Sequence, residues 1–385
     1  MAKIVIIGSA HPFRAGGVTT FNHRLAKEFI DLGHECAIYS FSLQYPSFLF
    51  PGKTQYTQEP PPEGLTIHSV INSVNPLNWA RIGNRLSKER PDIIVVRFWL
   101  PLMGPAFGTI LKRVRKNRYT KIICIADNIV PHEKRPGDHA FTKYFLKSCD
   151  AFITMSEKVM NDLKSFEPGK PAQLVAHPLY DNFGAAIPKT VARNHLGLSQ
   201  NEKIVLFFGF IRKYKGLDLL LEAMSLLQQP NLKPQTSNIK LLIAGEFYEP
   251  EKAYQDQIDK LGIRDHLILR TNFIPDSEVP YYICAADAVI QPYRNATQSG
   301  VTPLAYHFEK PMIVTNVGGL PSLISNEKSG LIVEPDPSSI AQGILKFYQL
   351  GENHFIPHIR TEKVKYSWTA MVNTIIQMAN NTHSK

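Results

Sequence analysis

The chain has 385 residues, 44% of them hydrophobic and 20% charged, a composition that excludes a disordered protein and suits two domains of comparable size. Its longest apolar runs, such as 93–96 and 204–208, are far shorter than the roughly 20 residues that span a bilayer, so no transmembrane helix is expected. The formal net charge of +10 permits attraction to nucleic acid, anionic lipid or anionic substrates.

The cysteines and the N-terminus indicate the compartment. Cys36, Cys124, Cys149 and Cys284 lie beside apolar segments, without close pairing or metal-ligand spacing. We therefore expect reduced residues in or near the core, and neither a disulfide framework nor a zinc site. The N-terminal apolar run stops at Gly8 and is too short for the hydrophobic region of a secretory signal, so a cytoplasmic protein is expected.

The first half of the chain alternates short apolar runs with helical patterns, which predicts a parallel sheet with crossover helices. Residues 43–64 are the exception, because they are rich in Pro, Gln and Ser and predict an irregular loop. The predicted strands are 3–8, 35–41, 66–71, 93–97, 121–126, 151–154 and 172–176.

The pattern weakens after His177, through Pro178, Gly184, Pro188 and Gly197, which indicates a linker between two domains. A second series of strands and helices then begins. Two doubly wound domains leave ligand sites at the carboxyl ends of their strands. The predicted strands of this second series begin at residue 204 and continue at 240–244, 266–271, 288–291, 312–315 and 330–333.

Two loops of the second half have the features of a phosphate cradle. The run 288–291 leads to a turn at Ser299 and Gly300 that opens a helix, where free backbone N–H groups and the positive dipole end suit a diphosphate. A later strand is followed by Gly318 and Gly319, where a chain without Cβ atoms can approach a ligand closely. For either loop alone, a buried scaffold whose glycines only turn the chain is the alternative.

In their order along the chain, these parts resemble the C-terminal half of the family 4 glycosyltransferases, retaining enzymes of the GT-B fold. The family signature reads E-G-F-G-x-x-x-x-E-A-x-A-x-G-x-P-V-V-x-T-x-x-G-G-x-x-E. Counted back from Pro311, its first two glutamates fall at Ala296 and Leu304, and Ser322 takes the place of the last one. A subset of the family carries A-T-x-S-G, as residues 296–300 do. The family's glutamate contacts to the donor ribose and sugar must therefore be absent here or supplied by other groups.

The resemblance implies an α/β protein of the GT-B fold, in which two doubly wound Rossmann-like domains face each other across a cleft. The N-terminal, acceptor-binding domain would comprise residues 1–180, and a linker would follow at 181–202. The donor-binding domain would comprise residues 203–352. The last helical segment, 353–385, would cross back to the first domain.

The resemblance also implies where the donor diphosphate binds. The family supplies an arginine and a lysine from a G-R-L-x-x-x-K-G segment. Lys215 and Gly216 match this segment, whereas Phe210 stands at the place of the arginine and Arg212 comes two residues later. Cations here would compensate the leaving diphosphate, and a solvated basic loop is the alternative. The other donor-binding residues implied are Gly17, Asn272, Phe273, Ile274, Thr297, Gln298, Ser299, Gly300 and Val301.

The end of the fifth predicted strand is where many family members place a histidine that faces the sugar. Asp127 and Asn128 occupy that point, and His132 follows a turn later. We expect Asp127 or His132 to be the catalytic residue that accepts the acceptor hydroxyl proton, a task that needs hydrogen-bond reach and a suitable pKa. A structural role is the alternative for His132, as burial is for Trp99. The acceptor-binding candidates are Gly16, Trp99 and Asn128.

The predicted function is a glycosyltransferase. It would move a hexose-type sugar from a nucleoside diphosphate to a hydroxyl of a glycan or lipid-linked glycan, with retention of configuration and no cofactor. No two aspartates are separated by a single residue, so the D-x-D metal motif is absent and the resemblance implies a metal-independent reaction. The missing glutamates leave a non-catalytic sugar-nucleotide-binding or partner protein as the alternative, and a two-domain sugar-nucleotide epimerase is a third possibility.

A dense basic run lies between residues 112 and 121, with six lysines and arginines in ten positions. On a helix, these cations would gather towards the C-terminal end, where they offset the dipole. A solvated helix end is the simpler interpretation. The functional interpretation is a peripheral contact with an anionic membrane that brings a lipid-linked acceptor to the site. Nucleic acid is not expected as a partner.

Overall fold

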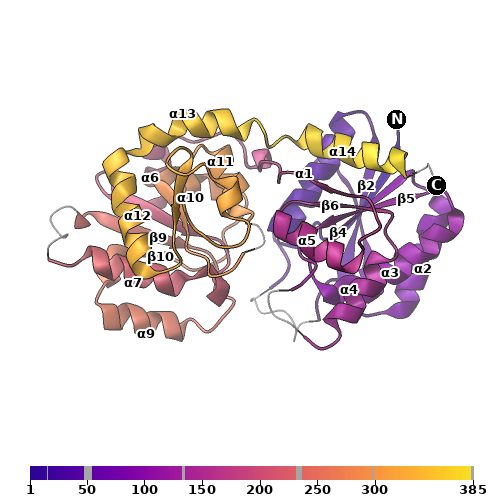
Figure 1. The fold of residues 1–385 in the computed structure, drawn as a ribbon, viewed down its shortest axis with the longest axis horizontal. Helices are drawn as coiled ribbons and strands as arrows, with labels where there is room; N and C mark the ends of the chain where they lie inside the picture. Colours follow the sequence, from indigo (N-terminus) through magenta and orange to yellow (C-terminus); the bar gives the residue numbers. More distant parts are fainter. Residues whose placement is uncertain (15, 47–53, 132–134, 231–235, 297–298, 383–385) are drawn as a thin grey trace. The chain divides into compact units, whose positions relative to one another are not determined.

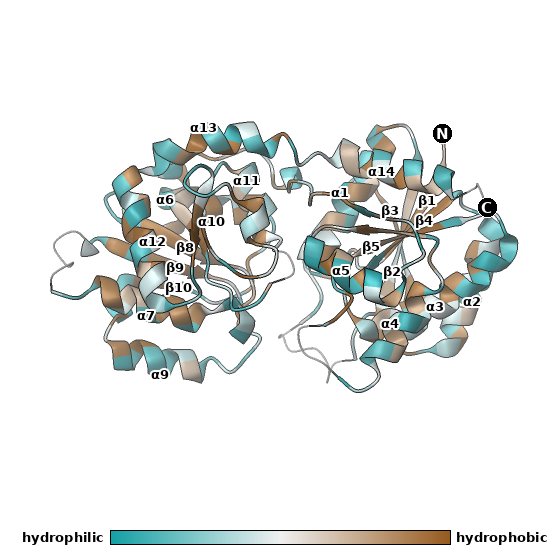
Figure 2. Cartoon of the chain, in the orientation of Figure 1, coloured by the Kyte–Doolittle hydropathy of each residue, from teal (hydrophilic) through white to brown (hydrophobic). Residues whose placement is uncertain are grey.

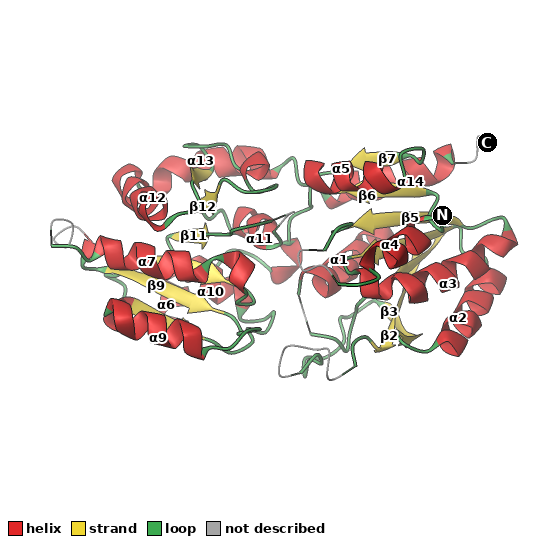
Figure 3. Cartoon of the chain, turned by 60° about the horizontal axis from the view of Figure 1, so that its bottom comes forward, coloured by secondary structure: helices red, strands yellow, loops and turns green. Residues whose placement is uncertain are grey.

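The structure is a computed structural model that describes residues 1–14, 16–46, 54–131, 135–230, 236–296 and 299–382. The chain forms two compact units: Met1–Pro178 together with Ser367–Lys385, and Leu179–Tyr366. Each unit contains one parallel sheet with helices packed on both of its faces (Figures 1 and 3). The predicted α/β architecture of two Rossmann-like domains is confirmed.

The first unit has a seven-stranded sheet in the order β3-β2-β1-β4-β5-β6-β7. All seven predicted strands are present, with ends that differ by two residues at most. The order reverses between β1 and β4, which pair in parallel with Ile6 opposite Val95. The strands are β1 Lys3–Ile7, β2 Glu35–Leu43, β3 Thr66–Asn72, β4 Ile93–Phe98, β5 Lys121–Ala126, β6 Ala151–Thr154 and β7 Ala172–Leu174.

Three helices of the first unit begin with a side-chain cap. Asn75 caps α2 by accepting hydrogen bonds from the backbone N–H groups of Leu77 and Asn78. Ser156 and Ser367 cap α5 and α14 in the same way, each with one backbone N–H. The helices are α1 Gly17–Asp31, α2 Pro76–Glu89, α3 Gly104–Val114, α4 Asp138–Leu146, α5 Glu157–Phe166 and α14 Trp368–Asn381.

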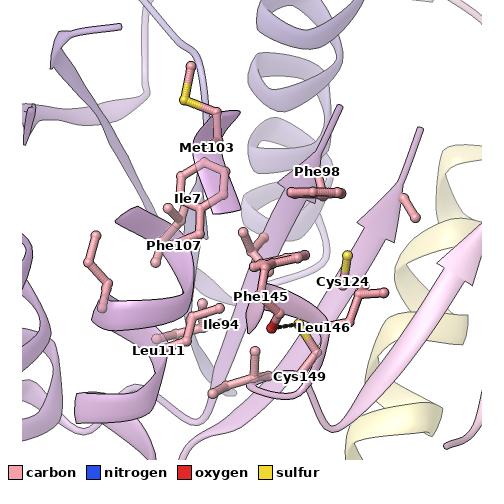
Figure 4. Close-up of a cluster of buried hydrophobic side chains, with 14 of the residues drawn as sticks. Ile7, Ile94, Phe98, Met103, Phe107, Leu111, Cys124, Phe145, Leu146 and Cys149 are labelled. Atoms are coloured by element: carbon pink, nitrogen blue, oxygen red, sulfur yellow. Dashed lines mark hydrogen bonds between the residues drawn. The ribbon is translucent and has the colours of Figure 1, made fainter. Parts of the chain in front are cut away.

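A hydrophobic cluster of the first unit lies between its sheet and helices α2, α3, α4 and α5 (Figure 4). Phe98 on β4 stacks on Phe145 of α4, with ring centroids 4.3 Å apart, and both rings are fully buried. Cys124 and Cys149 lie in the same cluster. All four cysteines are free and buried, as predicted, and burial raises the pKa of the Cys36 thiol to about 12. Hydropathy colouring shows the strands of both units as the apolar interior (Figure 2).

The second unit has a six-stranded sheet in the order β10-β9-β8-β11-β12-β13, and all six predicted strands are present. The strands are β8 Lys203–Phe208, β9 Ile239–Ala244, β10 Leu267–Arg270, β11 Ala288–Gln291, β12 Met312–Thr315 and β13 Gly330–Val333. The helices are α6 Lys189–Leu196, α7 Leu217–Leu227, α9 Lys252–Leu261, α10 Val279–Ala285, α11 Val301–His307, α12 Pro337–Leu350 and α13 Glu352–Lys363.

The boundaries of the second unit differ from those predicted from the sequence. Residues 181–202, expected to be a linker, contain α6 and group with the second unit. The reason is a buried carboxylate, since Asp287 accepts hydrogen bonds from Lys189 at 2.7 Å and Arg193 at 3.2 Å, both on α6. The chain re-enters the first unit at Ser367, so α13 belongs to the second unit and only α14 returns.

The described residues contain no helix that combines the length and the apolar character of a membrane span.

Candidate functional site

Two loops of the second unit meet where its sheet order reverses, at the carboxyl ends of β8 and β11. The backbone N–H of Arg294, after β11, donates to the carbonyl oxygen of Tyr214, after β8, at 2.7 Å. Gly216 has a φ of +67°, and a Cβ at this position would lie 2.0 Å from the carbonyl oxygen of Pro292. Glycine is therefore required for these two loops to pack so closely.

The loop after β12 packs against the loop after β11. Gly318 has a φ of +54°, and a Cβ there would lie 1.6 Å from the carbonyl oxygen of Ala296. The backbone N–H of Gly319 donates to that same oxygen at 3.3 Å, and the Thr315 hydroxyl donates to the carbonyl oxygen of Tyr293 at 2.6 Å. The close approach that the Gly318–Gly319 pair permits is thus to the backbone of a neighbouring loop.

Lys215 is a buried cation in this group of loops, with 9% of its surface exposed. Its Nζ lies 3.1 Å from the position of a Cβ on Gly209, directly after β8, and 5.8 Å from the ring centroid of Tyr293. Among the described residues, no side chain forms an ion pair with this ammonium group. Burial, and then the charge of Arg212, lower the pKa of Lys215 to about 7. A buried ammonium without a counter-ion is a favourable place for an anion.

Three aromatic rings lie near one another on the loops that follow β8, β9 and β10. Phe210, which stands where the family has an arginine, lies 4.3 Å from Tyr248 and 6.4 Å from Phe273 between ring centroids. The Arg212 guanidinium lies 5.1 Å from the Tyr248 centroid. All three rings are half-buried, whereas Asn272 is exposed. We name Tyr248, Phe210 and Phe273 the aromatic row; Tyr248 was missed in the sequence because one tyrosine in a loop gives no pattern.

The start of α11 forms the other side of this site. The Ser299 hydroxyl oxygen accepts a hydrogen bond from the backbone N–H of Val301 at 3.2 Å and lies 3.2 Å from the Tyr293 hydroxyl. Leu304, at the place of the second signature glutamate, is buried. Gly300 lies against Tyr180, whose hydroxyl oxygen would be 3.4 Å from a Cβ at that glycine. Thr297 and Gln298 lie outside the described residues.

In the first unit, Asp127 follows β5 at the carboxyl edge of the sheet and is buried. Both of its carboxylate oxygens accept hydrogen bonds from Arg97 of β4, from Nε at 2.7 Å and from Nη2 at 2.9 Å. Arg97 was not predicted as a site residue, although a cation at the end of an apolar strand was the available signal. Asn128 is half-buried beside this pair. His132 lies outside the described residues.

The other acceptor candidates lie at the same edge of the first sheet. The Trp99 indole N–H donates to the Tyr45 hydroxyl at 2.9 Å, and its ring contacts Phe41 and Phe107 with centroids 6.2 and 6.0 Å away. These contacts hold the Trp99 side chain in place, and it is half-buried. At the start of α1, the backbone N–H of Gly16 donates to the Thr20 hydroxyl at 3.2 Å, while Gly17 is the first helical residue.

The described part of the chain contains no group of three or more His, Cys, Asp or Glu side chains placed to hold a metal ion.

Comparison with protein families assigns both halves of the chain. The family described as "Glycosyltransferase Family 4" matches residues 15–177, and that described as "Glycosyl transferases group 1" matches residues 188–356. The chain belongs to glycosyltransferase family 4. The resemblance predicted from the loops of the second half is thus confirmed. Lys215 and the aromatic row lie within the part matched by the second family.

Individual proteins agree with this membership. A putative teichuronic acid biosynthesis glycosyltransferase, TuaC of Bacillus subtilis, is 24% identical over 283 residues, which are 70% of this chain and 67% of the relative. Across eight curated relatives, the aligned segment spans 41% to 67% of the relative's length.

Solved structures share the fold of this family 4 chain over its whole length. Sucrose-phosphate synthase of Thermosynechococcus elongatus superposes with a TM-score of 0.75, at 15% identity and covering 99% of both chains. The Anabaena protein HepE in complex with UDP-glucose has a TM-score of 0.70, at 15% identity and covering 98% of this chain and 100% of its own. The predicted GT-B fold is confirmed.

Proposed function

We propose that this glycosyltransferase moves a hexose-type sugar from a nucleoside diphosphate to a hydroxyl of a glycan or lipid-linked glycan, with retention of configuration and without a metal ion. The observation that carries the proposal is Lys215, a buried ammonium without an ion-pair partner among the described residues, at the loops that follow β8 and β11. A diphosphate would supply the missing counter-ions. The HepE structure with UDP-glucose supports a nucleotide-sugar donor for this fold.

The roles of the donor-site residues follow from their chemistry. Lys215 and Arg212 would compensate the charge that grows on the diphosphate as its bond to the sugar breaks. The backbone at Ser299, Gly300 and Val301, at the start of α11, would add N–H donors. The aromatic row offers ring faces on which a nucleobase can stack, so we assign the base to Phe210 and its neighbours, including the backbone of Asn272, Phe273 and Ile274.

The acceptor would bind at the carboxyl edge of the first sheet. Asn128 and Trp99 would bind the sugar that carries the reacting hydroxyl, with the backbone of Gly16 beside it, whereas Gly17 would approach the donor. Asp127 or His132 would accept the hydroxyl proton. The Arg97 partner holds the Asp127 carboxylate in one orientation, which is the condition for a group that must meet a hydroxyl at hydrogen-bond distance.

The donor assignment is tested by replacing one lysine and measuring ligand-induced stabilisation. UDP, GDP, ADP and dTDP are added in turn, with and without magnesium, and the melting temperature is recorded. We expect one nucleotide to stabilise the wild type with no need for magnesium and to lose this effect in Lys215→Ala. The matched control is Lys213→Ala, because Lys213 is exposed and two residues away. Equal stabilisation of Lys215→Ala and the wild type would contradict the assignment.

A second candidate is a non-catalytic sugar-nucleotide-binding or partner protein of the same fold. The residues at the three signature positions favour it, since Ala296 and Leu304 are buried, Ser322 is exposed and none is a carboxylate. Nucleotide binding alone does not separate the two candidates. Release of nucleoside diphosphate from a nucleotide sugar above the buffer rate would exclude the non-catalytic protein.

We also propose that the first unit contacts an anionic membrane surface at the cytoplasmic side. It holds 24 of the 43 lysines and arginines and 14 of the 33 aspartates and glutamates, so it carries the whole net charge of +10, whereas the second unit has 19 of each sign. Helix α2 exposes Leu77, at 82%, on the same face as Arg81 and Lys88. An apolar residue in line with cations suits a bilayer interface better than nucleic acid.

Vesicle co-sedimentation tests this contact. We expect binding to vesicles of phosphatidylcholine and phosphatidylglycerol, weak binding to phosphatidylcholine alone, and loss of binding in the double variant Arg81→Ser, Lys88→Ser. Lys252→Ser is the control, because this lysine is exposed on the second unit. Vesicle binding that does not depend on the anionic lipid, or equal binding by the double variant and the wild type, would exclude the membrane contact on α2.

A further inference from the structure

The ring of Phe21, on α1, is fully buried and has three partners in the first unit. The Arg97 guanidinium carbon lies 3.7 Å from its centroid. The imidazole of His177 meets it at 5.2 Å with an interplanar angle of 79°, and the indole of Trp368 meets it at 4.8 Å and 61°. One aromatic side chain thus joins three segments that are far apart in the sequence.

Two of these segments are the places where the chain leaves and re-enters the first unit. His177 precedes the boundary between Pro178 and Leu179, and Trp368 follows the one between Tyr366 and Ser367. On the other side of both boundaries, within the second unit, the backbone N–H of Leu179 donates to the carbonyl oxygen of Tyr366 at 3.2 Å. The two crossing segments, 177–179 and 366–368, are therefore bonded to each other and packed on Phe21.

The start of α14 is fixed to α1 by further contacts. The Arg24 guanidinium lies 5.2 Å from the Trp368 centroid and donates to Glu28 at 2.8 Å. The Thr369 hydroxyl donates to the other oxygen of the same carboxylate at 2.6 Å. These contacts fix the start of α14 to α1, and Trp368 lies directly against Phe21, so a change in the second crossing segment would reach the ring.

The third segment leads to the candidate catalytic residue. The Arg97 side chain is 3% exposed, its Nε and Nη2 bond Asp127, and its Nη1 has no partner among the described residues. Asp127 and the Phe21 ring are thus the main groups that fix the guanidinium. The attraction of a cation to an aromatic face is strongest when both are desolvated, as they are here.

We propose that Arg97, whose guanidinium lies over the Phe21 ring, is a positioning residue for Asp127. Through Phe21, the orientation of the Asp127 carboxylate then depends on both crossing segments. This inference rests on the proposed function, in which Asp127 meets the acceptor hydroxyl. A bidentate guanidinium fixes both carboxylate oxygens, so the carboxylate turns only when Arg97 moves. Arg97 moves when the ring beneath it moves, because a close-packed core leaves no space for independent adjustment.

Double-mutant kinetics test the coupling. Phe21→Leu keeps an apolar side chain and removes the aromatic face, and Phe29→Leu is the matched control on the same helix, equally buried and with no cation over its ring among the described residues. We expect Phe21→Leu to lower kcat at least tenfold with an unchanged KM for the donor, and Phe29→Leu to leave kcat within about twofold. In an Asp127→Asn background, Phe21→Leu should have little further effect. Additive effects in the double variant would overturn the proposal.

A measurement that needs no activity separates this inference from the proposed function. The Arg97 Nε–H is held by Asp127 and lies over a ring, so its NMR resonance is expected to be protected from exchange and shifted by the ring current. Phe21→Leu should move this resonance and speed its exchange, and Phe29→Leu should do neither. An unchanged resonance in Phe21→Leu would overturn the positioning role. Absence of transfer by the wild type, together with the expected NMR change in Phe21→Leu, would instead contradict the proposed function.

Discussion

Binding of a nucleotide sugar is expected to weaken steeply as the pH rises through neutrality, because the cation assigned to the diphosphate loses its proton. The pKa of Lys215 is about 7 in the free protein, lowered by burial and by Arg212. A bound diphosphate would restore the ordinary preference for the charged form, with a pKa near the usual value of about 10.4. Binding is thus coupled to proton uptake, at full strength below pH 7 and progressively lost above it.

The size of the effect follows from the protonated fraction of the free lysine. With a pKa of about 7, about 90% of the amine is charged at pH 6 and about 3% at pH 8.5, so the Kd should rise about 30-fold, which is about 2 kcal/mol. Calorimetric titration measures the Kd at each pH. The ligand is UDP-glucose, or the nucleotide sugar of the base that stabilises the protein most. Both phosphates of such a donor are esterified, so the ligand's phosphate charge stays constant over this range.

Lys215→Arg is the control, since a guanidinium stays charged throughout. Its affinity is expected to vary less than about threefold between pH 6 and 8.5, whatever its absolute value. A wild-type Kd that does not depend on pH would show that a titrating Lys215 does not bind the diphosphate. The same slope in Lys215→Arg would show that another group titrates.

Three further variants test the packing around the site by chemical denaturation. Without ligand, Lys215→Met should raise the free energy of unfolding, and should raise it more at pH 6 than at pH 9. The pKa of Lys215 is lowered in the folded protein, so burying its charge costs most below pH 7 and progressively less as the pH rises towards the pKa of the unfolded chain. A larger stabilisation at pH 9 than at pH 6 would contradict burial of a charged Lys215. Asp287→Asn should lower the free energy of unfolding by about 3 kcal/mol, because Lys189 and Arg193 lose a shared carboxylate; a loss below about 0.5 kcal/mol would contradict its role in fixing α6. Gly318→Ala should cost at least about 2 kcal/mol, since its φ is positive and the Ala296 carbonyl fills the space, whereas Gly169→Ala, with open space around it, should be neutral; equal costs would contradict the loop packing.

The fold could be predicted from the sequence because strands and crossover helices leave local patterns. Each predicted strand is an apolar run of four to eight residues bounded by turn residues, and all thirteen are present. Helix α6 was missed because Pro188 and Gly197 at its two ends have the composition of a linker. Its membership in the second unit depends on Asp287, which follows Lys189 by 98 residues and Arg193 by 94, and no local pattern contains that contact.

The candidate site was predictable only where a single residue matched the family segment. Lys215 followed from its place before Gly216, and the structure adds that it is buried and lacks an ion-pair partner among the described residues. The aromatic row joins three loops, and the Arg97–Asp127 pair joins two strands, so both depend on sheet order rather than on spacing. Asp127 was predicted as an acceptor of a proton, and its guanidinium partner was not, because pairing across β4 and β5 is invisible in one sequence.

The proposed reaction transfers a sugar from a nucleotide donor held by Lys215. The most direct measurement is release of nucleoside diphosphate from UDP-, GDP-, ADP- and dTDP-sugars by the purified protein, with a metal chelator present. We expect release from donors of one base above the buffer rate, lost in Lys215→Ala and kept in Lys213→Ala. Release from none of them by a folded protein that is stabilised by one nucleotide would contradict the transferase and favour the non-catalytic binding protein.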